Sequence, residues 1–105
     1  MAAKEHDLKT TPAAFHAVRN KLKLFEFRKN DRGFEEGDVL ILHEYDEKAQ
    51  YYSGLVERVR VTYIVTGPDF GIPVGYACMS IRRCIDEELE QNRKLDKYEF
   101  KARRR

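Results

Sequence analysis

The stretch Lys21–Asp38 constrains the fold of this chain most, because it combines a strand pattern with turn signals and directly precedes an apolar run. Phe25–Arg28 alternates aromatic and charged side chains at the two-residue period of a β-strand, which places Glu26 and Arg28 on one face. Glycine-containing turns follow, and they lead into the apolar run Val39–Leu42. We expect this run to be an interior strand that is buried on both faces.

The remaining patterns predict an α+β domain. Thr11 and Pro12 form a helix start, and apolar residues at three- and four-residue steps extend the expected helix to Leu22. The other expected elements are a short strand over Glu5–Lys9, a loop over Glu47–Gly54, a long strand over Leu55–Thr66, a loop over Gly67–Pro73, a closing strand over Gly75–Ile81 and a terminal helix from Asp86. Within the long strand, Val59, Val61, Tyr63 and Val65 should share one face.

Length and composition favour a single domain, residues 1–85, followed by a C-terminal helix and basic tail, residues 86–105. Residues 1–90 carry 13 Lys and Arg against 16 Asp and Glu, whereas residues 91–105 carry seven against two. Phosphate binding by the body would therefore need local clustering of cations, and the terminal run Lys101–Arg105 is a separate candidate. No apolar run approaches a membrane span and no signal segment opens the chain, so we expect a cytoplasmic protein.

Several motifs occur together in a fixed order, and their combination resembles one known family. They are His6–Lys9, Phe25–Arg32, Phe34–Asp38, Glu44–Asp46 and Gly75–Ile81. Over about His6–Arg82 the chain resembles the ASCH domains of the PUA-like superfamily, and within it a small bacterial and phage family of uncharacterised function. The resemblance implies a β pseudo-barrel with a helix over a cleft, and relatives that handle RNA, nucleosides or RNA modifications.

Two positions depart from the ASCH pattern. That pattern usually has glycine two residues before its lysine, Lys23 here, but this chain has Lys21 there. The acetylcytidine amidohydrolase branch uses a threonine three residues after the lysine as nucleophile, and Glu26 occupies that position. We therefore expect no threonine-dependent deacylation.

The candidate ligand-binding residues cluster around the charged strand. They are Lys9, Lys23, Glu26, Arg28, Asn30, Arg32 and Tyr45. The cations offer donors to phosphate or a base edge, Glu26 orients them or accepts from an amine, and Tyr45, like its neighbours Tyr51 and Tyr52, could stack on an unpaired base. The alternative for Glu26 and Arg28 is a structural ion pair worth about 0–1 kcal/mol. We expect both side chains to point into one cleft near Lys23, with Phe25 and Phe27 turned away from solvent.

Three functions remain open on the sequence. The first is a module that binds RNA or a nucleotide through a basic cleft. The second is a hydrolase acting on RNA or a modified nucleoside, with Lys23 and Glu26 as proton-transfer groups. The third is a phage or host protein-interaction adaptor. His6 and His43 have no nucleophile placed beside them by a motif, and we expect structural or surface roles for them. The acidic residues lack metal-site spacing, so neither a metal nor a cofactor is predicted.

Overall fold

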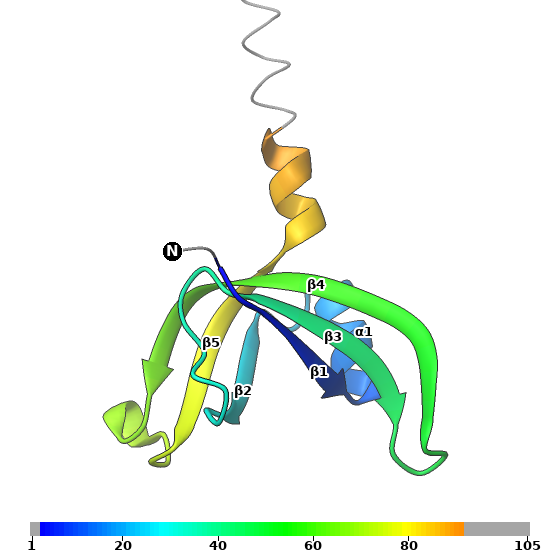
Figure 1. Cartoon of the computed structure of the whole chain (residues 1–105). Coiled ribbons are helices and arrows are strands. Elements are labelled where there is room, and N and C mark those ends of the chain that lie inside the picture. Colours follow the sequence, from blue (N-terminus) through cyan, green and yellow to red (C-terminus); the bar gives the residue numbers. More distant parts are fainter. Residues whose placement is uncertain (1–2, 92–105) are drawn as a thin grey trace, which may run out of the picture.

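The computed structural model describes residues 3–91, in which a five-stranded sheet curls into a half-barrel with a helix against its inner side (Figure 1). The elements are β1 (Glu5–Thr10), α1 (Pro12–Arg19), β2 (Phe25–Lys29), β3 (Val39–Asp46), β4 (Tyr51–Thr66), a 3₁₀ turn η1 (Asp69–Gly71) and β5 (Tyr76–Arg83). The strand order is β1-β3-β4-β5-β2, with β1 parallel to β3 and the other pairs antiparallel. The predicted fold class, an α+β pseudo-barrel with a helix, is confirmed.

Helix α1 begins where the sequence predicts and ends earlier. The Thr11 side chain accepts a hydrogen bond from the Ala14 backbone N–H, and Pro12 occupies the first helical position. Lys21 then adopts a left-handed backbone conformation with φ of 61°, which turns the chain out of the helix. Leu22, which we expected on the buried stripe, is 81% exposed for this reason.

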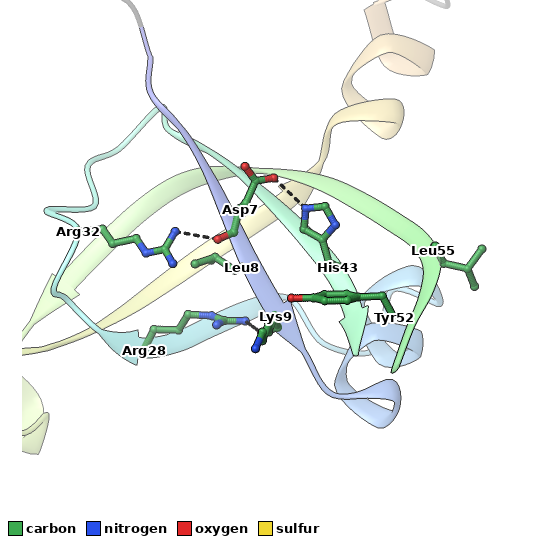
Figure 2. Close-up of a pocket in the computed structure, with 9 residues that line it drawn as sticks. Asp7, Leu8, Lys9, Arg28, Arg32, His43, Tyr52 and Leu55 are labelled. Atoms are coloured by element: carbon green, nitrogen blue, oxygen red, sulfur yellow. Dashed lines mark hydrogen bonds and ion pairs between the residues drawn. The ribbon is translucent and has the colours of Figure 1, made fainter. Parts of the chain in front are cut away.

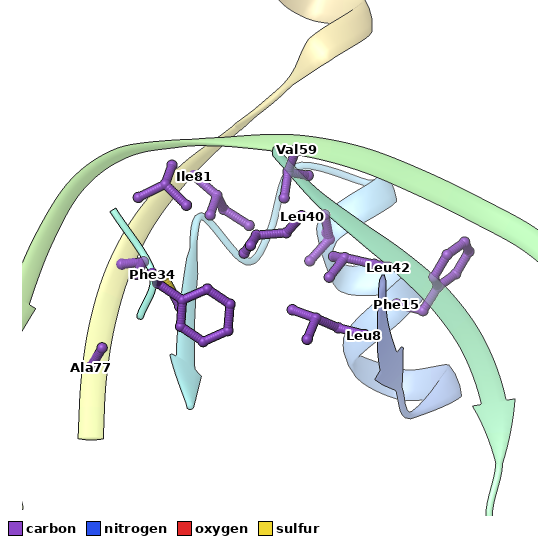
Figure 3. Close-up of a cluster of buried hydrophobic side chains, with 11 residues drawn as sticks. Leu8, Phe15, Phe34, Leu40, Leu42, Val59, Ala77 and Ile81 are labelled. Carbon is purple, nitrogen blue, oxygen red and sulfur yellow. The ribbon is translucent and has the colours of Figure 1, made fainter. Parts of the chain in front are cut away.

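The core fills the space between α1 and the inner face of the sheet (Figure 3). Phe15 and Val18 are the buried residues of α1, and they join Leu40, Leu42 and Val59 in one cluster. Fully burying a side chain of this size contributes about 1.5–3 kcal/mol. The expected burial of the Val39–Leu42 run is largely confirmed, because three of its four side chains are buried and Ile41 is partly exposed.

A β-bulge in β4 reverses part of the predicted alternation. Val59 and Val61 point inward as expected, but the register with β5 shifts between Val61 and Tyr63. Beyond the shift Tyr63 is 62% exposed, and Ile64 packs against the core instead. The prediction that Tyr63 shares a face with Val59 is therefore wrong, because one extra residue inverts every later position.

The hairpin and the end of the described chain also differ from expectation in their bounds. The predicted loop Glu47–Gly54 is confined to residues 47–50, since Tyr51 already pairs with Asp46. Residues 84–91 are helical, so the terminal helix starts just before Asp86, while the basic run Lys101–Arg105 lies outside the described residues. Within residues 3–91, no helix combines the length and apolar character needed to cross a membrane.

The edge strands of the half-barrel, β1 and β2, are bridged by arginine side chains instead of a backbone ladder (Figure 2). Arg28 on β2 donates to the carbonyl of Lys9 at 3.0 Å. Arg32, in the turn after β2, donates to the carbonyl of Asp7 at 2.7 Å. We call this junction between β1 and β2 the seam. Its guanidinium groups satisfy backbone carbonyls that an edge strand would otherwise present to solvent.

Candidate functional site

Arg28 is the central residue of the seam. Its Nε donates to Glu26 Oε2 at 3.0 Å, and its Nη2 donates to the Lys9 carbonyl at 3.0 Å and to Thr10 Oγ1 at 3.1 Å. A guanidinium has five N–H donors, and these contacts use at most three of them. Arg28 is thus held in place from three sides while it keeps donors for a further partner.

Glu26 is a buried carboxylate with one unsatisfied oxygen. It is only 3% exposed, and among the described residues its Oε1 accepts no hydrogen bond. The Lys23 ammonium forms an ion pair with this oxygen at 3.1 Å and donates a hydrogen bond to the Phe25 carbonyl at 2.6 Å. The oxygen is therefore charge-compensated but accepts no hydrogen bond, and it is a candidate acceptor for a ligand N–H.

The strand period placed Glu26 and Arg28 together but did not identify the inner face. The two side chains share a face and contact each other, with Lys23 beside them, as expected. The expectation that Phe25 and Phe27 face away from solvent is wrong, because they are 48% and 46% exposed. A two-residue period separates the faces of a strand, and here the inner one carries ion-paired groups. The aromatic pair lies on the outer face instead.

The seam opens into a pocket of about 590 Å³ (Figure 2). We call it the seam pocket. Its lining residues are Asp7, Leu8, Lys9, Arg28, Arg32, His43, Tyr52, Gly54 and Leu55. The volume falls in the range of about 300–1,000 Å³ that is typical of small-molecule and cofactor sites. Three cations from two edges of the sheet converge on this pocket, and Asp7 is the one carboxylate in its lining.

An aromatic group flanks the cationic side of the seam pocket. The Lys9 ammonium lies 4.5 Å from the ring centroid of Tyr45, and the ring centroids of Tyr45 and Tyr52 are 4.6 Å apart. Tyr52 lines the pocket, whereas Tyr45 is not part of the lining and contacts Lys9 as its cation–π partner. Tyr45 therefore positions the lysine, and Tyr52 is the ring that a ligand in the pocket would meet.

Four of the seven predicted ligand-binding residues do not line the seam pocket: Lys23, Glu26, Asn30 and Tyr45. The Asn30 side chain accepts from the Phe34 backbone N–H at 2.9 Å, which makes it a turn-forming residue. Lys23 lines a separate small cavity of about 80 Å³, with Val18 of α1, Lys21 and Arg83 among the other lining residues. The structure therefore brings Lys9, Arg28 and Arg32 together in one pocket and places Lys23 apart from it.

Sequence reasoning gave the pair of His43 and Asp7 no role in the pocket. His43 Nε2 lies 2.8 Å from Asp7 Oδ1, and both residues line the pocket. They meet because β1 runs parallel to β3, with Lys9 opposite His43 in the register. No local pattern in the sequence encodes that pairing. The two-residue alternation of β1, which puts Asp7 and Lys9 on one face, was the available part of the signal.

The pair of His6 and Asp38, unlike that of His43 and Asp7, is buried, and its role is structural. Burial alone would raise the pKa of Asp38, but a hydrogen bond with the His6 side chain and hydrogen bonds from the backbone N–H groups of Glu35 and Lys4 outweigh it and lower that pKa. These bonds join the start of β1 to the turn before β3. Within residues 3–91, no group of three or more His, Cys, Asp or Glu side chains is arranged to hold a metal ion.

Fold and pocket define a class, a small α+β half-barrel with a basic pocket where its two edge strands meet. The chain belongs to the family described as Domain of unknown function (DUF3850), which matches residues 5–81 and thus α1 and most of the sheet. It is also 37% identical over 70 residues to the "Uncharacterized 12.9 kDa protein in GpA 3'region" of Escherichia phage P2. That match covers 67% of this chain and 62% of the phage protein, so the chain spans less than two thirds of this relative. The expected relation to a small phage and bacterial family is confirmed.

Proposed function

We propose that this protein binds RNA or a nucleotide in the seam pocket, with Lys9, Arg28 and Arg32 as phosphate-binding residues. The observation that carries the proposal is the convergence of these three cations, from β1 and from the β2 end, on one pocket of about 590 Å³. Residues 1–90 have an excess of acidic side chains, so a local cationic cluster is the feature that would attract a phosphate.

The chemistry of the pocket suits a nucleotide. Guanidinium groups offer planar, paired donors that match phosphate oxygens, and Arg28 and Arg32 are pre-oriented by their bonds to β1 carbonyls. Tyr52 offers an aromatic ring for a base, and base–aromatic stacking contributes about 1–3 kcal/mol. Phosphate and base thus each have a complementary group in the same pocket.

The resemblance to ASCH domains supports the same proposal. Relatives in that superfamily handle RNA, nucleosides or RNA modifications. At the position where their pattern carries glycine, Lys21 adopts φ of 61°, a left-handed conformation that glycine accommodates most readily. The backbone after α1 therefore keeps a glycine-like path, even though the side chain is lysine.

The test is a fluorescence anisotropy titration with a labelled single-stranded RNA. We expect Arg32→Ala to weaken binding about tenfold, since it removes a charge-assisted phosphate contact. Arg82→Ala is the matched control, because Arg82 is an exposed arginine of β5 that is paired with Glu90 and lies outside the seam pocket. Affinity of the wild type should also fall as salt rises from about 50 to about 200 mM.

Two results of this titration would contradict the proposal. One is equal affinity of wild type, Arg32→Ala and Lys9→Ala for the same RNA. The other is complete loss of affinity on deleting Lys101–Arg105 while the seam variants bind normally, which would make the basic tail the nucleic-acid element.

The contact between Lys23 and Glu26 favours a second candidate, a hydrolase acting on RNA or a modified nucleoside. The ammonium and the unsatisfied Glu26 oxygen lie 3.1 Å apart, within reach for proton transfer. Glu26 would act as the base for a water molecule, because threonine is missing at its position. Incubation with acetylcytidine and with short single-stranded RNA tests this: turnover that both Lys23→Ala and Glu26→Gln abolish, with the fold intact, would establish an enzyme.

A further inference from the structure

An exposed aromatic pair lies on the outer face of β2 and β5. The rings of Phe27 and Tyr76 are stacked, with centroids 5.6 Å apart and planes 19° from parallel. They remain 46% and 37% exposed, although aromatic side chains of this size usually bury most of their surface. Lys29 follows on the same strand face and pairs in register with Tyr76. We call these two rings the outer platform.

The outer platform is continuous with the seam pocket. A second pocket of about 360 Å³ is lined by Leu8, Phe27, Arg28, Lys29, Asp31, Arg32, Phe34 and Tyr76, so it holds three cations and one carboxylate. The same two arginines line the seam pocket on their other side. The two pockets therefore adjoin at Arg28 and Arg32, and we call the surface from Tyr52 across these arginines to the outer platform the track.

Aromatic rings lie at the two ends of this track, and arginines lie between them. Tyr52 lies at one end and the Phe27–Tyr76 pair at the other, with Arg28 and Arg32 between them and Lys29 beside the platform. A third, largely apolar hollow of about 500 Å³ extends the surface past Phe27 to Phe70, which is 92% exposed. Contiguous exposed apolar surface of this kind marks an interaction site.

We propose that the ligand of the seam pocket is a segment of single-stranded RNA several nucleotides long, which crosses the seam and stacks a base on the outer platform. The inference rests on the proposed function and names its substrate class. Phosphates of the segment contact Arg28, Arg32 and Lys29, and its bases meet Tyr52 on one side and Tyr76 on the other. A mononucleotide fills the seam pocket alone, and a base-paired duplex does not present the unpaired base faces that such rings stack on.

The experiment compares ligand length on matched variants by fluorescence anisotropy and competition. Wild type, Tyr76→Ala, Phe27→Ala and Tyr63→Ala are titrated with a mononucleotide and with labelled single-stranded RNAs of about three, six and nine nucleotides. Tyr63→Ala is the control, since Tyr63 is an exposed tyrosine of β4 that lines neither of the two pockets. All substituted side chains are at least one third exposed, and thermal unfolding checks that each variant folds.

We expect wild-type affinity to rise at least tenfold from the mononucleotide to the longer RNAs. Tyr76→Ala and Phe27→Ala should lower the affinity for the longer RNAs about fivefold or more and leave the affinity for the mononucleotide unchanged. Tyr63→Ala should bind every ligand as wild type does. Equal affinity for all lengths, with no effect of Tyr76→Ala, would overturn this inference and leave the seam pocket as a nucleotide site. Absence of binding at any length would overturn the proposed function as well.

Two further outcomes would also overturn the inference. If Tyr63→Ala weakens the longer RNAs as much as Tyr76→Ala does, binding involves the aromatic surface in general and not a track. If the protein self-associates without RNA and Phe27→Ala abolishes that association, the platform is an interface between copies of the chain. Analytical ultracentrifugation of wild type and Phe27→Ala distinguishes this case.

Discussion

Glu57 and Glu26 are two buried carboxylates that each lie between two cations, and they differ in how completely they are satisfied. Glu57 accepts from Arg19 at 2.5 Å through one oxygen and from Arg83 at 2.9 Å through the other. Glu26 accepts from Arg28 through one oxygen, while its other oxygen accepts no hydrogen bond from the described residues. Both side chains are almost fully removed from solvent.

This difference indicates a structural role for Glu57 and leaves Glu26 able to accept a hydrogen bond from a ligand. Glu57 joins α1 to β5 and has a donor on each oxygen, so a ligand could contact it only by breaking an existing bond. Glu26 lies next to the seam and keeps an unused acceptor. A buried polar group that a fold leaves incomplete often marks a site of function, because its hydrogen bond forms only with a partner present.

Substitution of Glu57 should have the largest effect on stability. We expect Glu57→Gln to lower the free energy of unfolding by about 2 kcal/mol, because Arg19 loses its charged partner and Arg83 keeps, among the described residues, only the longer contact with Asp86 at 3.7 Å. Arg19 and Arg83 are partly exposed, and water reduces the cost below that of a fully buried pair. Urea denaturation measures this change in the free energy of unfolding, with Glu47→Gln, at an exposed position, as control. A change as small as that of the control would show that the Glu57 contacts contribute little.

A third buried carboxylate, Asp38, extends the comparison to pH. Its pKa is lowered in the folded protein, since its hydrogen bonds outweigh the effect of burial. Its contribution to stability is therefore present above its unfolded pKa, near 3.8, and is lost as pH falls through the lower folded pKa. We expect wild type to lose stability more steeply than Asp38→Asn as the pH falls from about 5 to about 2, with the exposed Asp31→Asn following wild type. Parallel curves for wild type and Asp38→Asn in thermal unfolding would contradict this.

The smallest expected effect on stability is that of Glu26→Gln. Glu26→Gln removes the ion pairs with Lys23 and Arg28, but the amide oxygen still accepts from Arg28 and the other oxygen of Glu26 has no hydrogen bond to lose. We therefore expect a cost of about 1 kcal/mol in urea denaturation, below that of Glu57→Gln. If Glu26→Gln costs as much as Glu57→Gln, the two carboxylates are equivalent structural clamps, and the contrast between them fails.

Local periodicity predicted much of this molecule. The start of α1, the strand positions and the shared face of Glu26 and Arg28 all follow from spacings of two to four residues. The position after α1 was harder, since the left-handed conformation of Lys21 overrides a helical pattern that continues to Leu22. Patterns of this kind reflect residues that are close in the sequence, and they predict secondary structure well where local interactions determine it.

Long-range register decided the rest. The bulge after Val61 exchanged the roles of Tyr63 and Ile64, and the parallel pairing of β1 with β3 brought Asp7 to His43. The sequence predicted the cations of the candidate site, Lys9, Arg28 and Arg32, but not the pocket that they line. That pocket exists only because β1 and β2 are the two edge strands of one sheet. That arrangement depends on contacts across the whole chain.

Binding at the seam is tested most directly by chemical-shift mapping of isotope-labelled protein titrated with short single-stranded RNA. We predict that the perturbed backbone amides cluster on residues 7–9, 28–32 and 52–55, around the pocket that Lys9, Arg28 and Arg32 line. Perturbation confined to residues 92–105, or spread evenly over the protein with no concentration at the seam, would contradict it.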